Sequence, residues 1–274
     1  MAKAHKTPNR IDVMFDRLKA EGRKALVTFA VADDPDREES LAALHAFVAS
    51  GIDLIELGYP FSDPILDGAT IQRANRRALE GGGNLAAALD LVVAFRQTDK
   101  TTPIILMGYS NPLVAMGYEA FASRAAAAGI DGIIAADMPL READDLLAQL
   151  DKNGLVMVAL SAPTLDAADF SARPGVGGFL YCIPVVGPTG GPSASIETIS
   201  GAVERLRPLT KLPVLVGFGI KTPEAAAETA AVADGAIVAS ALIEEVHSKN
   251  PDRTSRLAAY ARLIGDYRQA LDAL

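Results

Sequence analysis

The chain has 274 residues, half of them hydrophobic, and 26 basic against 34 acidic side chains give it a net charge of -8. This length and apolar content favour a single domain over residues 1–274 with one sizeable core. No cluster of Lys and Arg could follow a nucleic-acid backbone, and no apolar run approaches the roughly 20 residues that span a bilayer. We therefore expect no nucleic-acid or membrane partner.

The first residues and the cysteine content indicate the compartment. Residues 1–8 lack the apolar core of a secretory signal and are expected to form a loose tail. Cys182 is the only cysteine, which excludes an internal disulfide and suits a reducing environment. The sequence therefore predicts a cytoplasmic protein in which Cys182 is a buried packing residue.

Short apolar runs alternate with amphipathic stretches along the whole chain, which is the pattern of successive βαβ units. The eight runs are residues 25–29, 52–57, 103–107, 132–136, 155–160, 178–182, 213–217 and 235–239. Helices are predicted at residues 12–20, 39–50, 118–128, 141–153 and 254–273. Eight strands favour a closed (β/α)8 TIM barrel with an extra N-terminal helix, and an open doubly wound sheet is the alternative.

Glu56 is the first candidate catalytic residue. The alternation of a strand places Ile52, Leu54 and Glu56 on one face, so Glu56 would point into the barrel near the end where such barrels have their active sites. Burial raises the pKa of a carboxyl, which lets one group give and take a proton near neutral pH. The alternative is a structural glutamate paired with Lys or Arg, but the apolar runs contain no such base.

The segment from Gly58 to Gly68 follows the same run and contains two prolines, so it is predicted to be a stiffened loop. Asp67 lies 11 residues after Glu56, which is enough chain to return over the barrel mouth and set two carboxylates across one ligand. An Asp beside Gly or Pro is more commonly a turn or cap residue. The residues alone leave both interpretations open.

Glycine-rich segments after the last three strands indicate a phosphate site. Gly217-Phe-Gly219 ends the seventh run, and a helix beginning near Ser240 would direct its positive end at an anion. Residues 188–192 could form a further part of this phosphate site. Lys221 could add positive charge to the site or be solvated. Other chemistry finds little support, because the chain has no nucleotide P-loop, no paired metal-ligand motif and no lysine within the strand runs. Its three histidines are scattered, which argues against a metal site or a histidine-based triad.

Residues 56–72 read Glu-Leu-Gly-x-Pro-Phe-Ser-Asp-Pro-x-x-Asp-Gly-x-x-Ile-Gln, which resembles the signature of tryptophan synthase alpha subunits. Further matches lie at residues 34–35, 107–112, 136–139, 181, 187–190 and 217–219. The resemblance implies a lyase that cleaves indole-3-glycerol phosphate by a retro-aldol reaction into indole and glyceraldehyde 3-phosphate, with no cofactor in this chain.

The resemblance also assigns roles to residues. Glu56 would perform the proton transfers, Asp67 would hold the indole N–H, Thr189 would orient Asp67, and Tyr181 would line the reacting region. The phosphate contacts would be Gly190, Gly219, Ala239 and Ser240. The walls of an indole pocket would be Phe29, Ile71, Met107, Tyr109, Ile134, Leu160 and Phe218, although an apolar residue in such a strand is more often barrel filling.

Members of this family work with a pyridoxal-phosphate beta subunit in an alpha2beta2 heterotetramer that passes indole through a protected channel. The resemblance places this chain's share of that contact at Pro60, Asp63, Asn111 and Pro139. Proline and asparagine are also ordinary loop residues, so these positions alone do not establish a partner.

Four positions depart from the family pattern. Asp33 stands where a glycine is usual, Val185 and Val186 occupy a loop in which polar or basic residues are common, and Ala239 replaces a customary glycine beside the phosphate. These departures motivate two alternatives. One is a divergent stand-alone paralogue acting on indole-glycerol phosphate or another aryl or sugar phosphate, and the other is a non-catalytic regulatory barrel.

Overall fold

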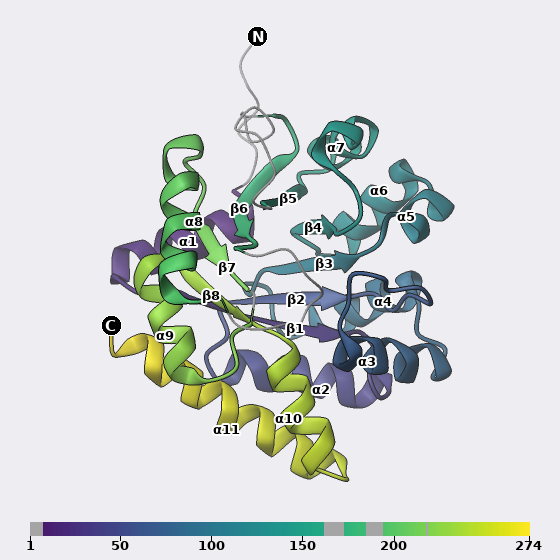
Figure 1. The fold of residues 1–274 in the computed structure, drawn as a ribbon. Helices are drawn as coiled ribbons and strands as arrows, with labels where there is room; N and C mark the ends of the chain where they lie inside the picture. The colour runs from purple at the N-terminus through teal and green to yellow at the C-terminus, as the bar shows by residue number, and fades with distance from the viewer. Residues whose placement is uncertain (1–7, 162–172, 185–193, 218) are drawn as a thin grey trace.

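Eight parallel strands pair in chain order, and β8 pairs with β1 to close the barrel (Figure 1). The computed structural model describes residues 8–161, 173–184, 194–217 and 219–274. The strands are β1 (Ala25–Val31), β2 (Leu54–Gly58), β3 (Ile104–Gly108), β4 (Gly132–Ala135), β5 (Val156–Ser161), β6 (Val176–Cys182), β7 (Val214–Val216) and β8 (Gly235–Val238). The predicted TIM barrel is therefore confirmed, and each strand lies within two residues of its predicted bounds, while the loose tail at residues 1–8 lies outside the described residues except for its last residue.

Helices surround the barrel, and α1 supplies the extra N-terminal helix (Figure 1). The α-helices are α1 (Arg10–Glu21), α2 (Arg37–Ala49), α3 (Ala69–Glu80), α4 (Leu85–Phe95), α5 (Ser110–Met116), α6 (Tyr118–Ala128), α7 (Asp144–Lys152), α8 (Ile196–Leu206), α9 (Pro223–Val232), α10 (Ser240–Lys249) and α11 (Arg253–Asp272). Short 3-10 turns lie at η1 (Leu140–Glu142) and η3 (Arg207–Leu209).

Four of the five predicted helices differ from the observed ones in their bounds, and for α1 and α11 the difference is one or two residues at each end. The helix expected at residues 39–50 begins at Arg37, because the side chain of Asp36 accepts the Glu39 N–H and caps the first turn. The stretch expected as one helix at residues 141–153 divides into η1 and α7, with Ala143 between them.

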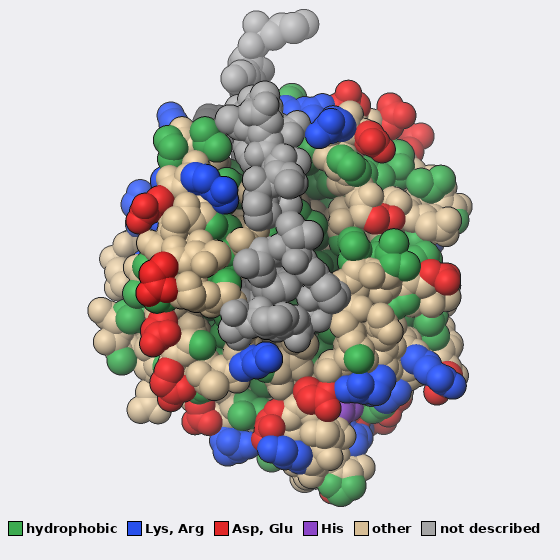
Figure 2. Space-filling view, viewed as in Figure 1, with side chains coloured by type: hydrophobic (Ala, Val, Ile, Leu, Met, Phe, Trp, Pro, Cys, Tyr) green, Lys and Arg blue, Asp and Glu red, His purple; other side chains and the backbone are tan. Residues whose placement is uncertain are grey.

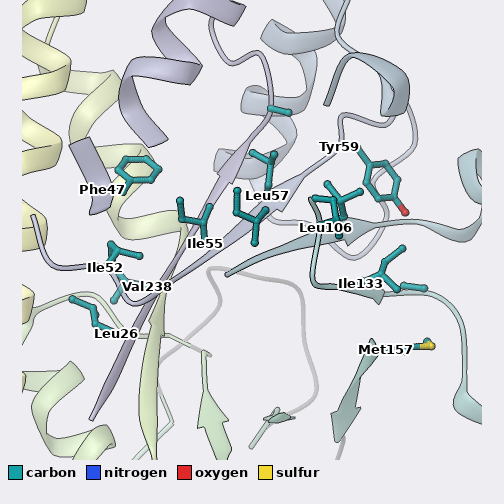
Figure 3. Close-up of a cluster of buried hydrophobic side chains, with 14 of the residues drawn as sticks. Leu26, Phe47, Ile52, Ile55, Leu57, Tyr59, Leu106, Ile133, Met157 and Val238 are labelled. Carbon is teal, nitrogen blue, oxygen red and sulfur yellow. The ribbon is translucent and has the colours of Figure 1, made fainter. Parts of the chain in front are cut away.

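Alternation along the strands produces two apolar layers. Val27, Leu54 and Ile134 belong to the cluster that fills the barrel, whereas Ile55 and Leu57 belong to the larger cluster between the strands and the helices. Figure 3 shows side chains of this outer layer. The inward direction predicted for Leu54 is therefore confirmed. Ile52 was wrongly placed on the same face, because it precedes β2 and packs in the outer layer.

The amino-terminal end of the barrel is closed by α1 and by two buried aspartates. Ile11, Met14 and Leu18 of α1 pack into the cluster that fills the barrel. Asp53 accepts the Leu26 N–H at 3.0 Å, and Asp131 accepts the Ile104 N–H at 2.8 Å. Two arginines also donate to each carboxylate. Arg17 and Arg268 bind Asp53, and Arg10 and Arg96 bind Asp131. Each aspartate thus fixes the start of two adjacent strands. Each is also the last residue of a Gly-Ile-Asp sequence.

The outer surface is mixed in charge, and α11 covers one side of the barrel against α2, α9 and α10 (Figure 1). Acidic and basic side chains are interspersed over the face shown in Figure 2. Within the described ranges no single helix has both the length and the apolar run needed to cross a membrane, and only α3 and α4, bent by 88°, meet both requirements as a pair.

Asp33 occupies an unfavourable position in the loop after β1. Its φ of 62° is in the left-handed region, where a side chain is usually strained. The residue is 6 % exposed, and neither carboxylate oxygen has a hydrogen-bond partner within the described part of the chain. Burial raises the pKa of this carboxyl, although the charge of Arg37 opposes the rise.

We predict that Asp33→Gly raises the free energy of unfolding at pH 7 by about 1 kcal/mol, because glycine removes both the strain and the buried unpaired carboxylate. Asp33→Asn should retain the strain but remove the charge. Since burial raises the pKa of Asp33, its ionised form destabilises the fold above the ordinary value of 3.8, and the gain in Asp33→Asn should shrink as pH falls toward that value. Urea unfolding at several pH values measures both effects, and a loss of stability in Asp33→Gly would contradict the prediction.

Candidate active site

A pocket opens among the carboxyl ends of the strands, where TIM-barrel active sites lie. Its walls come from β1, β2, β3, β6, the loops after β2 and β7, the first turn of α3, and the N-cap and first residue of α10. The lining residues are Phe29, Glu56, Asp67, Ile71, Met107, Tyr181, Gly217, Gly219, Ile220, Ala239 and Ser240. The structure therefore brings together most of the residues that the sequence selected from six separate segments.

Glu56 lies inside the barrel at the level of this pocket. It pairs in register with Phe29 of β1 and Ile105 of β3, and it is 1 % exposed. Its Oε1 has no hydrogen-bond partner within the described residues. Burial alone raises the pKa of this carboxyl to about 8, since no cation offsets the loss of water. The structure thus favours the proton donor over the salt-bridged structural glutamate.

Asp67 reaches the pocket from the loop between β2 and α3. The loop is held locally, because the Asp67 N–H donates to the Pro64 carbonyl and the Gln72 side chain donates to the Asp67 carbonyl. Burial raises the pKa of the Asp67 carboxyl to about 6, and a hydrogen bond from the Tyr109 hydroxyl opposes that rise. At pH 7 Glu56 is therefore mostly protonated and Asp67 is mostly ionised.

Tyr181 faces the same pocket from β6, and its position depends on Gly217. A Cβ at residue 217 would lie 2.1 Å from the Tyr181 Oη, so only glycine leaves room for the phenol. Burial and the charge of Glu56 raise the pKa of Tyr181 well above its usual value, which keeps the hydroxyl protonated. The sequence indicated Gly217 only as part of the phosphate site, and it gave no signal for this space or for Ile220 as a lining residue.

The first turn of α10 forms another side of the pocket. Ala239 is the N-cap and Ser240 the first residue of this ten-residue helix, so the positive end of the helix borders the cavity. Gly219 lines the same side in a left-handed conformation with φ of 74°. Lys221 is exposed, in keeping with a solvated side chain. These features match the requirements of an anion site.

The predicted indole walls separate into three groups. Phe29, Ile71 and Met107 line the pocket, and Tyr109 lines an adjoining cavity that also contains Asp67. The structure does not bring the other two described walls into either cavity. Ile134 is fully buried in the cluster that fills the barrel, and Leu160 packs against that cluster.

Several predicted positions fall on segments that the structure does not describe. They are Thr189, Gly190 and Phe218, together with the valines at 185 and 186 and the part of the phosphate site at residues 188–192. Of the predicted partner contacts, Asp63, Asn111 and Pro139 are exposed at the same end of the barrel, whereas Pro60 is buried. Cys182 is buried as predicted. His45 stacks on Phe95, and His247 is partly buried beside Asp34 rather than lying on the surface.

Comparison with known proteins identifies the family. The family model for the tryptophan synthase alpha chain matches residues 15–272. The tryptophan synthase alpha chain of Caulobacter vibrioides is 50% identical over 243 residues, which are 88% of this chain and 88% of that protein. The corresponding chain of Granulibacter bethesdensis is 47% identical over 267 residues, or 97% of this chain and 96% of the relative.

This chain belongs to the tryptophan synthase alpha-chain family. It is accordingly a TIM-barrel lyase of tryptophan biosynthesis, and nothing in the comparisons favours a stand-alone paralogue or a regulatory barrel. The crystal structure of tryptophan synthase subunit alpha from Legionella pneumophila superposes with a TM-score of 0.90 at 39% identity, covering 98% of this chain and 100% of that one. A chain of Mycobacterium tuberculosis tryptophan synthase gives 0.86 at 33% identity, covering 97% and 99%.

Burial of the Glu56 carboxyl destabilises the folded chain at neutral pH. The unfolded chain releases the Glu56 proton near its ordinary pKa of 4.5, whereas the folded chain holds it to about 8. The folded state therefore binds more protons between these values, and its stability falls as pH rises through this window.

We predict that Glu56→Gln becomes more stable than the wild type as pH rises from about 4.5 to about 8, with a constant difference above that range. Thermal unfolding across this range tests the prediction. Glu119→Gln is a matched control, because the Glu119 side chain is 76% exposed. Equal pH dependence in both variants would show that Glu56 is not the group responsible.

Proposed function

We propose that indole-3-glycerol phosphate is cleaved in this pocket by acid–base chemistry of Glu56 and Asp67. The observation that carries the proposal is the separation of their pKa values on either side of neutrality, about 8 for Glu56 and about 6 for Asp67, in one cavity. Two carboxyls with opposite protonation at one pH can serve as acid and as anionic acceptor at the same time. The two groups need no metal or organic cofactor in this chain for these roles.

Glu56 supplies the proton that the bond cleavage needs. Its neutral carboxyl protonates C3 of the indole, and the carbon–carbon bond to the glycerol chain then breaks. The resulting carboxylate removes the proton from the glycerol hydroxyl as the aldehyde forms, which restores the neutral acid. Protons thus balance over the cycle, and the high pKa from burial fits both halves of it.

Asp67 stabilises the positive charge that protonation of C3 places on the indole ring. Its ionised carboxylate accepts the ring N–H, and the interaction strengthens as the nitrogen becomes cationic. Tyr181, held protonated by burial, lines the reacting region. Thr189 orients Asp67 in this proposal by family resemblance.

The phosphate binds at the first turn of α10, against the backbone N–H groups that begin at Ser240. Gly219 and Gly190 contribute further contacts, the latter by resemblance. Ala239 places a methyl group where relatives have glycine, so its backbone approaches the phosphate less closely. Phe29, Ile71 and Met107 provide an apolar surface for the indole ring.

A pyridoxal-phosphate beta subunit is the proposed partner, in an alpha2beta2 assembly. Asp63, Asn111 and Pro139 are exposed around the mouth of the barrel. Two apolar side chains accompany them, since Ile65 is 79% exposed and Val114 is 60% exposed. Exposed apolar groups of this kind are suited to burial by a partner. Pro60 acts through the shape of the loop, because it is buried.

We predict that Glu56→Gln lowers kcat for indole formation by about 10²–10⁴-fold, the usual contribution of a general acid–base group. The wild-type kcat/KM should be bell-shaped with limbs near pH 6 and 8, because cleavage needs ionised Asp67 and protonated Glu56. Release of indole measures both, and Glu119→Gln is expected to behave as wild type. Substantial activity in Glu56→Gln would overturn the assigned role.

We also predict that Ile65→Glu weakens binding of the beta subunit by about tenfold or more, since it places a charge in the apolar part of the contact. Val13→Glu is the matched control, because Val13 is 54% exposed on α1 at the opposite end of the barrel. Calorimetric titration with the beta subunit from the same genome compares the two. Equal affinities for both variants would place the contact elsewhere.

A further inference from the structure

Tyr109 connects the loop that carries Asp67 to the end of β3. It follows β3 directly, and its carbonyl accepts a hydrogen bond of 2.7 Å from the Tyr59 hydroxyl. Its ring stacks on Phe61 near the start of the loop, with centroids 5.0 Å apart and an interplanar angle of 26°. The Leu66 N–H near the end of the loop donates to the Tyr109 hydroxyl at 3.0 Å. One side chain therefore contacts both ends of the loop.

These contacts determine the direction of the Tyr109 proton. An amide N–H can only donate, so the hydroxyl oxygen acts as the acceptor for Leu66. The single proton of the hydroxyl is then free for a different acceptor, and the Asp67 carboxyl is its hydrogen-bond partner. A hydroxyl that donates to a carboxylate favours the ionised form. The Tyr109 hydroxyl therefore lowers the pKa of Asp67 against the larger rise that burial causes.

We propose that Tyr109 is the positioning residue for Asp67, holding its carboxylate ionised and directed before substrate binds. This role rests on the function proposed above for Asp67. The resemblance to relatives made Tyr109 only a wall of the indole pocket and gave the orienting role to Thr189. Tyr109 acts through the end of β3, which is separate in the chain from the segment that contains Thr189.

Other titratable groups near Asp67 do not reproduce this effect. Glu56 and Tyr181 share the pocket from β2 and β6, and burial keeps both protonated at neutral pH. Asp137, after β4, acts on Tyr109 by raising its pKa, and its carboxylate is bound by the backbone and hydroxyl of Ser110. Tyr109 is thus the group that opposes the effect of burial on Asp67.

The test compares Tyr109→Phe with Tyr59→Phe. The first removes the hydroxyl that binds Asp67 but keeps the ring and its stack on Phe61. The second removes a buried hydroxyl that supports the same loop through the Tyr109 carbonyl and does not bind Asp67. If the Tyr109 hydroxyl only supported the loop, the two variants would differ in the size of their loss in stability and would agree in every other measurement.

Carbon-detected NMR titration of the Asp67 carboxyl, assigned by its absence in Asp67→Asn, gives a readout that does not require catalysis. We expect Tyr109→Phe to raise the pKa of Asp67 by about one unit, because the opposing hydrogen bond is lost. The acid limb of the pH profile of kcat/KM should move to higher pH by the same amount. In the same variant, kcat should fall by a larger factor than KM rises. Tyr59→Phe should leave the Asp67 pKa and the limb in place.

An unchanged Asp67 pKa in Tyr109→Phe, or the same shift in Tyr59→Phe, would overturn the proposal. If the wild type fails to cleave indole-3-glycerol phosphate, the proposed function fails, while the NMR shift still decides the role of Tyr109. If Tyr109→Phe does not fold, Phe61→Leu is tested in its place. This substitution removes the aromatic ring on which Tyr109 stacks, and it should also raise the pKa of Asp67.

Discussion

The site depends on one constraint, which is the burial of an unpaired carboxyl inside a barrel otherwise filled by apolar side chains. Glu56 alternates with Leu54 on β2, so the strand that builds the core also places the acid in it. No cation accompanies it in the described residues, and the carboxyl stays protonated until about pH 8. The rest of the structure maintains that isolation, because a water-filled or ion-paired site would lower the pKa and remove the acid at neutral pH.

The opposite end of the barrel shows what the same residue types do when stability is the requirement. Asp53 and Asp131 are also buried, yet each binds a backbone N–H group and two arginines. Fully paired carboxylates fix the strand starts without leaving a group that can exchange protons. The two kinds of carboxyl thus lie at different ends of the barrel, with the arginine-paired aspartates at the amino ends of the strands and Glu56 at the pocket.

Much of this arrangement could be predicted from the sequence, because strand periodicity determines direction. Eight runs, the inward face of β2 and the buried Glu56 all follow from local pattern. Asp67 and Tyr109 could not be related in that way, since their contact joins two loops whose meeting depends on register and ring stacking. The space that Gly217 leaves for Tyr181 could not be predicted for the same reason, because the two residues lie on neighbouring strands. Ile134 was misjudged as a pocket wall because periodicity gives the face of a strand and not the depth along it.

Asp33 and Glu56 both leave buried carboxylate oxygens without a partner, but only one lies at the pocket. Unpaired burial alone is therefore a poor indicator of catalysis in this chain. The distinction comes from surroundings: Glu56 faces a cavity shared with a second carboxyl of lower pKa, whereas Asp33 lies in a strained turn beside the start of α2. Asp33 therefore destabilises the fold and does not line the pocket. A strained or unpaired group identifies a functional site only when a ligand-sized space and a complementary group accompany it.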